Sequence, residues 1–514
     1  MNPPSVSASQ ILNQAHALLQ SNHFEAAEHM YRQTLMVGDT SGGAWMGLGV
    51  SLARQQRVRE ARAMLDKAPP AFARQLKGTA LAGVLFDLAD EMQKVQGHDA
   101  SLKVIERALK LNPASARGHH LHAQALMRMG LVAQARTAAQ RAVKLAGATT
   151  QDASNADILL AVLEARAGEF TQAAQRLADV GADKTDPNRA RALLELGRLH
   201  DRRGEYAQAF DCLSQAGQAA LGMPEIAMID RDAVARDLAH DATLAANWPF
   251  SVQAGDAPTP VFMIGFYRSG TTLLEQMLAA HPAIVTSDEA DLLPYVLRKH
   301  AAATGGQGWA KTLAAGGADL RGKLREMYWQ RARTLFGDQI EGRLLIDKTA
   351  LNTVNLAFIR ALFPEAKILF VVRDPRDVCI SAFMQAFKPN PLTAQFLEWE
   401  RGLRFYAAVM GHALQLRQSL GFEWLTLRYE DLIADFEREI VRVLTYLNLP
   451  WDAGVLDYRK APDLRHVSTP SHADVAKPIY RDAQGRWQNY RSHFEAHAGL
   501  LAPYRREWGY DDPV

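Results

Sequence analysis

A short pattern recurs six times within the first 220 residues and limits how this half of the chain can fold. Each copy has a polar or glycine turn, a bulky residue, and then a small residue that opens a helical stretch rich in Ala, Leu, Gln and Arg. The small residues lie 34, 40, 34, 38 and 36 residues apart: Ala27, Ala61, Ser101, Ala135, Ala173 and Ala209. Because one helix pair cannot bury its apolar face alone, the pattern predicts a stacked array of helix pairs.

Two short motifs make this half similar to the tetratricopeptide repeat, a helix–turn–helix unit of about 34 residues. Residues 45–49 (Trp-x-x-Leu-Gly) match the opening of that repeat, and residues 108–113 (Ala-Leu-Lys-Leu-Asn-Pro) resemble its close. The resemblance implies an all-α repeat array over residues 1–222, followed by a capping helix and linker over residues 223–260. The array either holds a peptide or partner protein or serves only as a scaffold, and the sequence leaves both open.

Length and composition bound the class of protein. A chain of 514 residues predicts at least two domains, and 48% hydrophobic with 22% charged residues fits a soluble protein. The net charge of +2 gives no case for binding nucleic acid or a membrane. The two cysteines, Cys212 and Cys379, exclude a disulfide framework and favour a reducing compartment. With no signal peptide and no apolar stretch of about 20 residues, we expect a cytoplasmic protein.

The segment 261–280 predicts a strand, a tight loop and a helix in succession. Residues 261–264 are apolar and too few for a helix, whereas residues 273–280 have helical apolar spacing. Gly265 and Gly270 bound the loop between them. Such a loop aims backbone N–H groups and the positive end of the helix dipole at one point, which predicts an anion site, most naturally for phosphate.

The loop has the spacing of the nucleotide-binding motif G-x-x-x-x-G-K-[ST], with one departure. Thr271 stands where the motif has the lysine that reaches the β- and γ-phosphates of ATP, which counts against ordinary ATP hydrolysis. Arg268, inside the loop, supplies a planar set of donors suited to phosphate or sulfate oxygens.

Further strands alternate with helices along the second half. The segments 344–346, 367–372 and 424–427 each predict a strand that releases polar residues at its carboxyl end. This order predicts, for residues 261–514, a P-loop-type α/β domain with a parallel sheet and a site along one edge. The glycines within residues 305–317 predict a loose segment, interpreted as a lid.

Two motifs in this half resemble those of sulfotransferases. The loop contains Arg-Ser-Gly-Thr-Thr, and the strand 367–372 runs into Val-Arg-Asp-Pro-Arg-Asp, with a serine eight residues beyond its first arginine. Sulfotransferases use 3′-phosphoadenosine 5′-phosphosulfate (PAPS) and release the desulfated product (PAP). The resemblance implies that Arg373 and Ser381 hold the 3′-phosphate. It implies that the first loop holds the 5′-phosphosulfate through Arg268, Ser269, Gly270, Thr271 and Thr272.

Over residues 261–487 the pattern is most similar to tyrosylprotein sulfotransferases and to bacterial sulfotransferases fused to repeats. This similarity implies that Glu289 is the catalytic glutamate, that Lys348 acts on the transferring group and that Tyr429 lies against the nucleotide. The animal enzymes have a membrane anchor, for which this sequence offers no candidate segment.

The similarity also implies a nucleotide-contacting segment near the end of the chain, with Ser471, Lys477 and Arg486. Two residues of this sequence differ from those of the animal enzymes, which weakens the assignment of individual roles by similarity. Gln385 stands where the animal enzymes have an arginine on the 3′-phosphate, and Arg486 replaces a lysine.

Sulfuryl transfer moves an electron-poor SO₃ unit in line between two oxygens, so the protein chiefly positions groups and neutralises charge. We expect Lys348 and Ser471 to stabilise charge on the bridging and transferring oxygens, and Arg268 to neutralise the donor. The acceptor hydroxyl must lose its proton, so a base is required. Glu289 is the expected base, with Asp288 its close rival.

Other candidates are weaker. His281 is a third candidate base, but its His-Pro setting at a helix end favours a capping or packing role. Ser269 and Cys379 lack a recognisable partner base for covalent catalysis. The histidines at 119, 120 and 122 are interpreted as a solvated helix face, and no metal is expected.

The sequence hypothesis is a PAPS-dependent sulfotransferase acting on a hydroxyl acceptor. A tyrosine of a peptide or protein selected by the repeats is one candidate acceptor, and a saccharide or small phenol are others. The alternatives are a P-loop kinase-like phosphotransferase and a non-catalytic repeat adaptor with a degenerate nucleotide-binding domain. Whether the chain forms a homodimer stays open.

Overall fold

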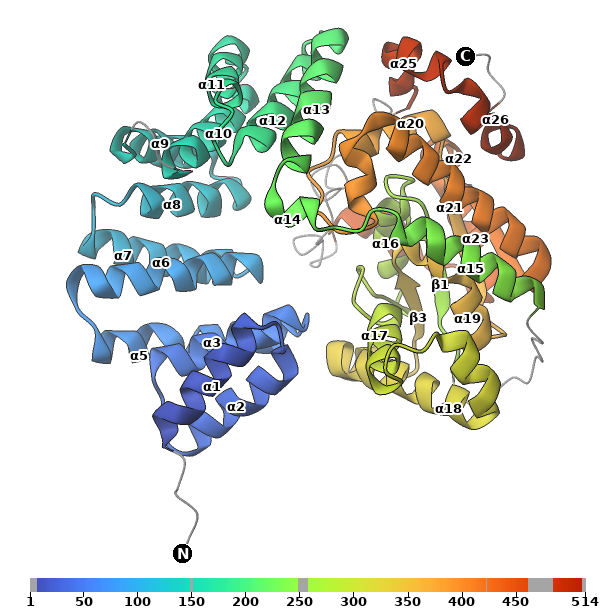
Figure 1. Ribbon diagram of the computed structural model, residues 1–514, viewed down its shortest axis with the longest axis horizontal. Coiled ribbons are helices and arrows are strands. Elements are labelled where there is room, and N and C mark those ends of the chain that lie inside the picture. Colours follow the sequence, from blue (N-terminus) through green and yellow to red (C-terminus); the bar gives the residue numbers. More distant parts are fainter. Residues whose placement is uncertain (1–6, 148–150, 248–257, 422, 461–483, 511–514) are drawn as a thin grey trace, which may run out of the picture. The chain divides into compact units, whose positions relative to one another are not determined.

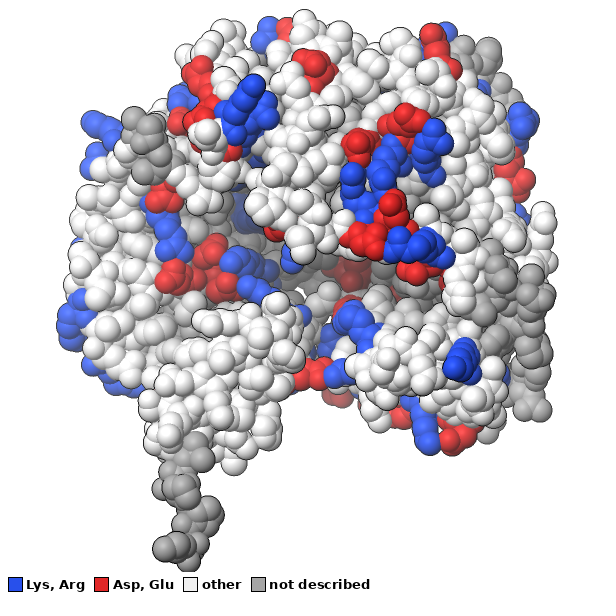
Figure 2. Space-filling view, in the orientation of Figure 1, with Lys and Arg blue, Asp and Glu red and all other residues white. Residues whose placement is uncertain are grey.

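The computed structural model describes residues 7–147, 151–247, 258–421, 423–460 and 484–510. It divides into two compact units, Met1–Gly204 and Glu205–Val514 (Figure 1). Among the described residues, no helix combines the length and apolar character that crossing a membrane requires. On the face drawn in Figure 2, basic and acidic side chains lie interspersed, in keeping with the net charge of +2.

The first unit consists of helices that each pack against the next one along the chain. They are α1 (Ala8–Gln20), α2 (Phe24–Met36), α3 (Gly42–Arg54), α4 (Val58–Leu65), α5 (Ala68–Gln75), α6 (Gly78–Lys94), α7 (His98–Leu111), α8 (Ala116–Arg128), α9 (Val132–Leu145), α10 (Gln151–Arg166), α11 (Phe170–Ala182) and α12 (Arg189–Arg202). Successive pairs stack along the unit (Figure 1). The predicted helical repeat array is confirmed.

Every copy of the sequence pattern has the same backbone bend. Five positions before each small residue, the turn residue has a positive φ between 59° and 85°: Asn22, Gln56, Gln96, Gly130, Gly168 and Gly204. The six small residues, from Ala27 to Ala209, are all 0% exposed. The bend therefore reverses the chain at one position per repeat, and the small residue lets the helices approach closely, as predicted.

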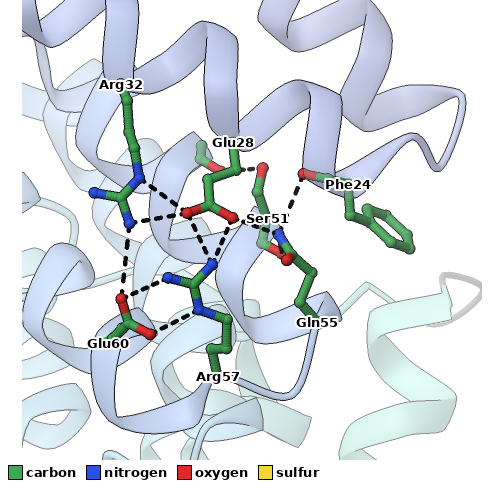
Figure 3. Close-up of polar contacts among 8 residues, drawn as sticks. Phe24, Glu28, Arg32, Ser51, Gln55, Arg57 and Glu60 are labelled. Atoms are coloured by element: carbon green, nitrogen blue, oxygen red, sulfur yellow. Dashed lines mark hydrogen bonds and ion pairs between the residues drawn. The ribbon is translucent and has the colours of Figure 1, made fainter. Parts of the chain in front are cut away.

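A polar contact links successive pairs at the position that follows the small residue. Glu28 in α2 accepts hydrogen bonds from Nη1 of Arg57, at 2.7 and 2.9 Å, in the turn before α4 (Figure 3). Three copies further on the charges are exchanged, because Arg136 in α9 donates at 2.7 Å to Glu169 in the turn before α11. The same two positions thus join neighbouring repeats with either arrangement of charge.

The longest spacing in the pattern, between Ala61 and Ser101, is explained by an additional helix. α5 lies between the second and third pairs and has proline in its first turn, where a missing N–H breaks no helical bond. A Cβ atom on Gly42 of α3 would lie 2.3 Å from the ring of Phe72 in α5. The inserted helix is therefore packed into the core of the array.

The last helix of the repeat pattern, α13 (Tyr206–Leu221), belongs to the second unit. The ring of Phe210 stacks on His493, with centroids 3.5 Å apart and planes inclined by 8°. A Cβ atom on Gly217 would lie 1.9 Å from the carbonyl oxygen of Leu397, so α13 packs closely against this unit. The units divide at residue 204, whereas the domain boundary predicted at 222 marks the end of the repeat pattern.

The second unit contains a five-stranded sheet in which every pairing is parallel. Its strands, in spatial order, are β2 (Ile284–Thr286), β3 (Leu344–Lys348), β1 (Val261–Gly265), β4 (Lys367–Val372) and β5 (Glu423–Arg428). The chain leaves the central strand β1 toward β2 and β3 on one side, and then crosses to β4 and β5 on the other. The order therefore reverses between β1 and β4, where α/β sheets bind ligands.

Helices cover both faces of the sheet, and the predicted α/β fold with a parallel sheet is confirmed. On one face, Val261 and Met263 share a core with the apolar residues of α16 (Thr271–Ala279) and α23 (Phe436–Leu447). On the other face, Phe262 lies against Tyr328 of α18 (Trp309–Phe336) and against Phe363, with ring centroids 6.5 and 5.8 Å away.

The other helices of this unit, among the described residues, are α14 (Pro224–Ala227), α15 (Ala233–Asn247), α17 (Leu293–Ala303), α19 (Leu356–Leu362), α20 (Pro375–Phe383), α21 (Trp399–Leu420), α22 (Tyr429–Ala434), α25 (Arg491–Glu495) and α26 (Ala498–Glu507). Short 3-10 turns are η1 (Gly337–Ile340), η2 (Ala350–Asn355), η3 (Thr393–Leu397), η4 (Ala453–Lys460) and η6 (Arg486–Tyr490).

The prediction of a loose segment over residues 305–317 is wrong from residue 309 onward. Gly316 and Gly317 lie within α18, where only Gly317 leaves helical geometry, at φ 55°. Its second half is anchored by buried Tyr328, whose hydroxyl donates to Asp347 of β3 at 2.9 Å, and by Trp329, whose indole N–H donates to the carbonyl of Pro258 at 2.9 Å. Gly317 therefore produces a kink within a helix rather than part of an irregular lid.

Candidate active site

The first loop turns sharply between β1 and α16. A Cβ atom on Gly265 would lie 2.2 Å from the carbonyl oxygen of Val371, so glycine is required where β1 and β4 approach each other. The hydroxyl of Ser269 donates at 2.5 Å to the carbonyl of Phe266 and braces the loop. Gly270, at φ 98°, directly precedes α16, so the helix N-terminus opens at the carboxyl edge of β1.

The second predicted anion motif meets this loop. Arg373 follows β4, and its Nη1 donates at 3.2 Å to the carbonyl oxygen of Arg268. Nε of Arg268 donates at 3.0 Å to Oγ of Ser381 in α20. The Arg373 guanidinium lies 5.0 Å from the centroid of the Tyr429 ring. Four residues predicted from three separate segments therefore gather at the switch point between β1 and β4.

Lys348 forms a second cluster at the end of β3, on the other side of β1. β3 continues through Asp347 and Lys348, which were predicted to follow the strand, because Lys348 pairs in register with Met263. The side chain of Lys348 is fully buried, and its Nζ lies 2.8 Å from Oε2 of Glu275 and 3.2 Å from Oε1 of Glu289. Glu275 is also fully buried, whereas the Glu289 side chain is 37% exposed.

The turn that carries Glu289 has an unusual backbone. Asp288 and Glu289 both have positive φ, at 44° and 60°, a conformation that costs about 1–3 kcal/mol for each non-glycine residue. Two hydrogen bonds hold it: the N–H of Asp288 donates to Oε1 of Glu275 at 2.8 Å, and the N–H of Glu289 donates to the carbonyl of Lys348 at 3.0 Å. The partly exposed carboxylate of Glu289 is thereby fixed beside the buried ammonium.

Burial and charge oppose each other in this cluster. Burial lowers the pKa of Lys348, but the carboxylates of Glu275, Glu289 and Asp288 outweigh it and bring the pKa above its ordinary value. Lys348 is therefore cationic at neutral pH. Burial raises the pKa of Glu275 to about 7, against the pull of Lys348.

Asp347, beside Lys348 in β3, faces a different partner. Its carboxylate accepts a hydrogen bond from the hydroxyl of Tyr328 at 2.9 Å, and both side chains are buried. Burial raises the pKa of Asp347 to about 7, although the Tyr328 hydroxyl opposes this shift. Asp347 thus belongs to the packing of α18 on the sheet.

The start of α20 also holds the segment near the end of the chain. Asp377 accepts hydrogen bonds from the N–H groups of Gly485 and Trp487, at 2.7 and 2.9 Å. The guanidinium of Arg376 lies 3.5 Å from the centroid of the Trp487 ring. Arg486, between these contacts, is half-buried in η6. The other two predicted residues of this segment, Ser471 and Lys477, lie outside the described residues.

Several rival candidates have structural partners instead. Nε2 of His281 lies 3.0 Å from the carbonyl of Pro450, and its Nδ1 accepts from the N–H of Ala283 at 3.1 Å, so the ring serves as a helix-end packing residue. Burial raises the pKa of the Cys379 thiol well above its ordinary value, which makes it a poor nucleophile. Gln385 donates to the carbonyl of Ser381 at 3.2 Å.

In the part of the chain that the structure describes, no group of three or more His, Cys, Asp or Glu side chains is arranged so that it could hold a metal ion. The histidines 119, 120 and 122 are half-buried rather than solvated as predicted. Burial lowers the pKa of His120 to about 4, and the neighbouring Arg191 adds to this effect.

Glu275 is the site residue that sequence reasoning missed. It lies between Leu274 and Met277 on a helix whose apolar residues enter the core. A carboxylate in such a position is rarely buried without a partner. The position of Glu275 among apolar residues could therefore have identified it from the sequence, but this position does not indicate that Lys348 is its partner.

Two family models match parts of the chain. Residues 260–453 match the model of the sulfotransferase family. Residues 12–75, 120–187 and 158–220 match that of the tetratricopeptide repeat.

Two relatives and one solved structure are similar to parts of this chain. An uncharacterized protein of Aquifex aeolicus is 28% identical to this chain. The match covers 59% of this chain and 40% of that protein's length. Protein-tyrosine sulfotransferase A of Caenorhabditis elegans is 25% identical over 49% of this chain and 67% of its own length. The sulfotransferase domain of the Synechococcus olefin synthase is 24% identical, with a TM-score of 0.33, over 46% of this chain and 91% of that domain.

Proposed function

We propose that the protein transfers a sulfuryl group from PAPS to a hydroxyl acceptor. The match of residues 260–453 to the sulfotransferase family model, with matches to the tetratricopeptide repeat before them, supports this proposal. The observation that carries this proposal is the meeting of Arg268 and Arg373 at the switch point between β1 and β4. PAPS is charged both at its ribose 3′-phosphate and at its 5′-phosphosulfate, so it requires two cationic sites in one crevice.

The donor is held by the elements that meet there. Arg268 and the N–H groups at the start of α16, including those of Thr271 and Thr272, bind the 5′-phosphosulfate. Arg373 and Ser381 bind the 3′-phosphate, which distinguishes PAPS from ATP. Ser269 braces the first loop, and Gly270 lets it pass beside the Tyr429 ring, against which the nucleotide packs. Ser471, Lys477 and Arg486 complete the proposed nucleotide contacts.

The transfer is a direct displacement at sulfur. A bond forms between the acceptor oxygen and sulfur while the bond from sulfur to the bridging oxygen of the 5′-phosphate breaks. PAP leaves with that electron pair, and the acceptor proton passes to the carboxylate of Glu289. The ammonium of Lys348, 3.2 Å from Glu289, stabilises charge on the bridging oxygen, together with Ser471.

We propose a tyrosine of a peptide or protein as the acceptor. Several relatives are named protein-tyrosine sulfotransferases, which supports this choice. An aryl hydroxyl, with a pKa near 10, also gives its proton to a carboxylate more readily than an alkyl hydroxyl does. Repeat arrays present extended surfaces suited to a peptide chain, so we assign acceptor selection to the first unit.

A thermal-shift experiment with PAP and with ATP·Mg²⁺ tests the proposal. PAP at about 100 times its Kd should stabilise the protein by about 2.7 kcal/mol, whereas ATP·Mg²⁺ should leave the melting temperature unchanged. Arg373→Ala should remove most of the PAP effect. Arg404→Ala, at an exposed arginine of α21 paired with Glu400, should retain it.

The other outcomes identify the rival functions. A shift with ATP·Mg²⁺ and none with PAP would favour a kinase-like phosphotransferase. No shift with either ligand would favour the non-catalytic adaptor. If PAP binds, incubation of the protein with labelled PAPS and a cell extract should place the label on a protein tyrosine rather than on a saccharide or a small phenol.

A further inference from the structure

We propose that Glu275 is a positioning residue of this reaction, whose buried carboxylate holds both Lys348 and the turn that carries Glu289. This inference rests on the proposed function and adds a residue to it. Glu275 lies in α16, Lys348 in β3 and Glu289 in the turn after β2, so one side chain connects three separate elements.

The two oxygens of the Glu275 carboxylate have different partners. Oε2 lies 2.8 Å from Nζ of Lys348, and Oε1 accepts the N–H of Asp288 at 2.8 Å. The first contact fixes the ammonium, and the second holds one of the two left-handed residues of the turn. Loss of the first contact would let the Lys348 side chain move. Loss of the second would let the turn relax, because positive φ is unfavourable for aspartate and glutamate.

The free energy of folding alone does not explain why this ion pair is buried. Glu275 and Lys348 are both fully buried, and the residues around Glu275 in α16 are core residues of the sheet. Replacing a buried ion pair by apolar residues is often neutral or stabilising, since desolvation offsets the attraction. The attraction between the two charges therefore does not by itself account for their burial, and we explain the charges by the reaction.

The reaction gives Glu275 a definite task. When Glu289 takes the acceptor proton, it loses its negative charge and its attraction for Lys348. Glu275 remains as a counter-ion that no acceptor reaches, so Lys348 stays charged while negative charge grows on the bridging oxygen. Without Glu275, Lys348 would have its strongest contact with Glu289 and would be drawn toward the base rather than the donor.

The charged groups around Glu275 also predict a pH effect. Lys348 faces it from β3 and Asp288 faces it from the turn after β2, while Glu289 contacts the same ammonium of Lys348. Burial raises the pKa of Glu275 to about 7, and its protonated form holds Lys348 less firmly. The turnover rate of the unmodified protein should therefore fall as the pH decreases through about 7.

Glu275→Gln tests the role, with PAP release from PAPS in the presence of a tyrosine-containing peptide as the assay. The amide keeps the shape of the side chain and can still accept the Asp288 N–H, but it removes the charge. We expect kcat to fall about 10- to 100-fold, as for a misplaced catalytic group. The Kd for PAP should stay within about 3-fold, and the decrease near pH 7 should disappear.

A matched control separates positioning from a general loss of packing. Glu439 in α23 is also buried and pairs with arginines, but lies outside the candidate site. Glu439→Gln should keep both kcat and the pH profile. Glu275→Asp keeps the charge on a side chain one methylene shorter, so it should recover part of the turnover and the decrease near pH 7.

The inference is overturned if Glu275→Gln folds, binds PAP and retains both the turnover rate and the pH profile of the unmodified protein. If Glu275→Gln does not fold, Glu275→Asp decides, because a rate and profile equal to those of the unmodified protein would also exclude the role. Failure of the unmodified protein to bind PAP would instead overturn the proposed function. The two failures are thus distinguished by one binding measurement.

Discussion

Nε of Arg268 donates a hydrogen bond to Oγ of Ser381 at 3.0 Å, although 113 residues separate them in the chain. Arg268 belongs to the loop after β1, and Ser381 to the helix that follows β4. The contact joins the two segments that the resemblance to sulfotransferases assigns to opposite ends of one nucleotide. It makes the geometry of one anion site depend on a residue of the other.

Ser381→Ala should therefore weaken PAP binding through two effects. It removes a proposed ligand of the 3′-phosphate and releases the side chain of Arg268. Hydrogen bonds to charged groups contribute about 1.5–3 kcal/mol, so the Kd for PAP should rise about 10- to 100-fold in calorimetry. Ser419→Ala, at an exposed serine of α21, is the control. An unchanged Kd in Ser381→Ala would exclude a contact with the 3′-phosphate.

Glu289→Gln should abolish turnover while it spares PAP binding. A positioned general base contributes about 10²- to 10⁴-fold to the rate, and the amide cannot accept the acceptor proton. The measurement is kcat for PAP release, alongside the Kd for PAP. Asp288→Asn is the comparison that distinguishes the neighbouring carboxylate. If Asp288→Asn is inactive and Glu289→Gln is fully active, the base is Asp288 and not Glu289.

Gly270→Ala should damage the first loop, because Gly270 has φ 98° and a Cβ there would lie 2.5 Å from the Tyr429 ring. We expect a lower melting temperature and a loss of PAP affinity of at least 10-fold, since the ring or the loop must move. Gly322→Ala is the matched control, in α18 with open space around its Cβ. It should keep PAP binding and stabilise the protein by about 0.4–1 kcal/mol.

Asp347→Asn should stabilise the protein more at alkaline than at acidic pH. Burial raises the pKa of Asp347 from 3.8 to about 7, so its ionisation opposes folding. This cost is small below about pH 4, grows as the pH rises and is complete above about pH 7. The difference in melting temperature between variant and unmodified protein should therefore be larger at pH 8 than at pH 5. Asp319→Asn, at a side chain that is 79% exposed, should show no such trend.

Local patterns predicted the elements well. Strand β4 has the same bounds, Lys367–Val372, in the prediction and in the structure, because the five apolar residues in a row after Lys367 suit a strand buried on both faces. The repeat turns were found for a similar reason, since a short pattern with a small residue encodes the bend locally. The glycines of residues 305–317 misled the prediction because packing of α18 on the sheet outweighed their local flexibility.

The sequence by itself determined the two fold classes and the segments in which cationic and acidic residues follow strands, because periodicity and strand ends are local properties. Only the tertiary structure decided which charges meet. Glu275 and Lys348 are 73 residues apart and become partners because β3 lies beside β1, which α16 directly follows. Sheet order results from the packing of the whole domain, and apolar spacing along the chain does not encode it. The partner of a buried charge is therefore settled only when the domain folds.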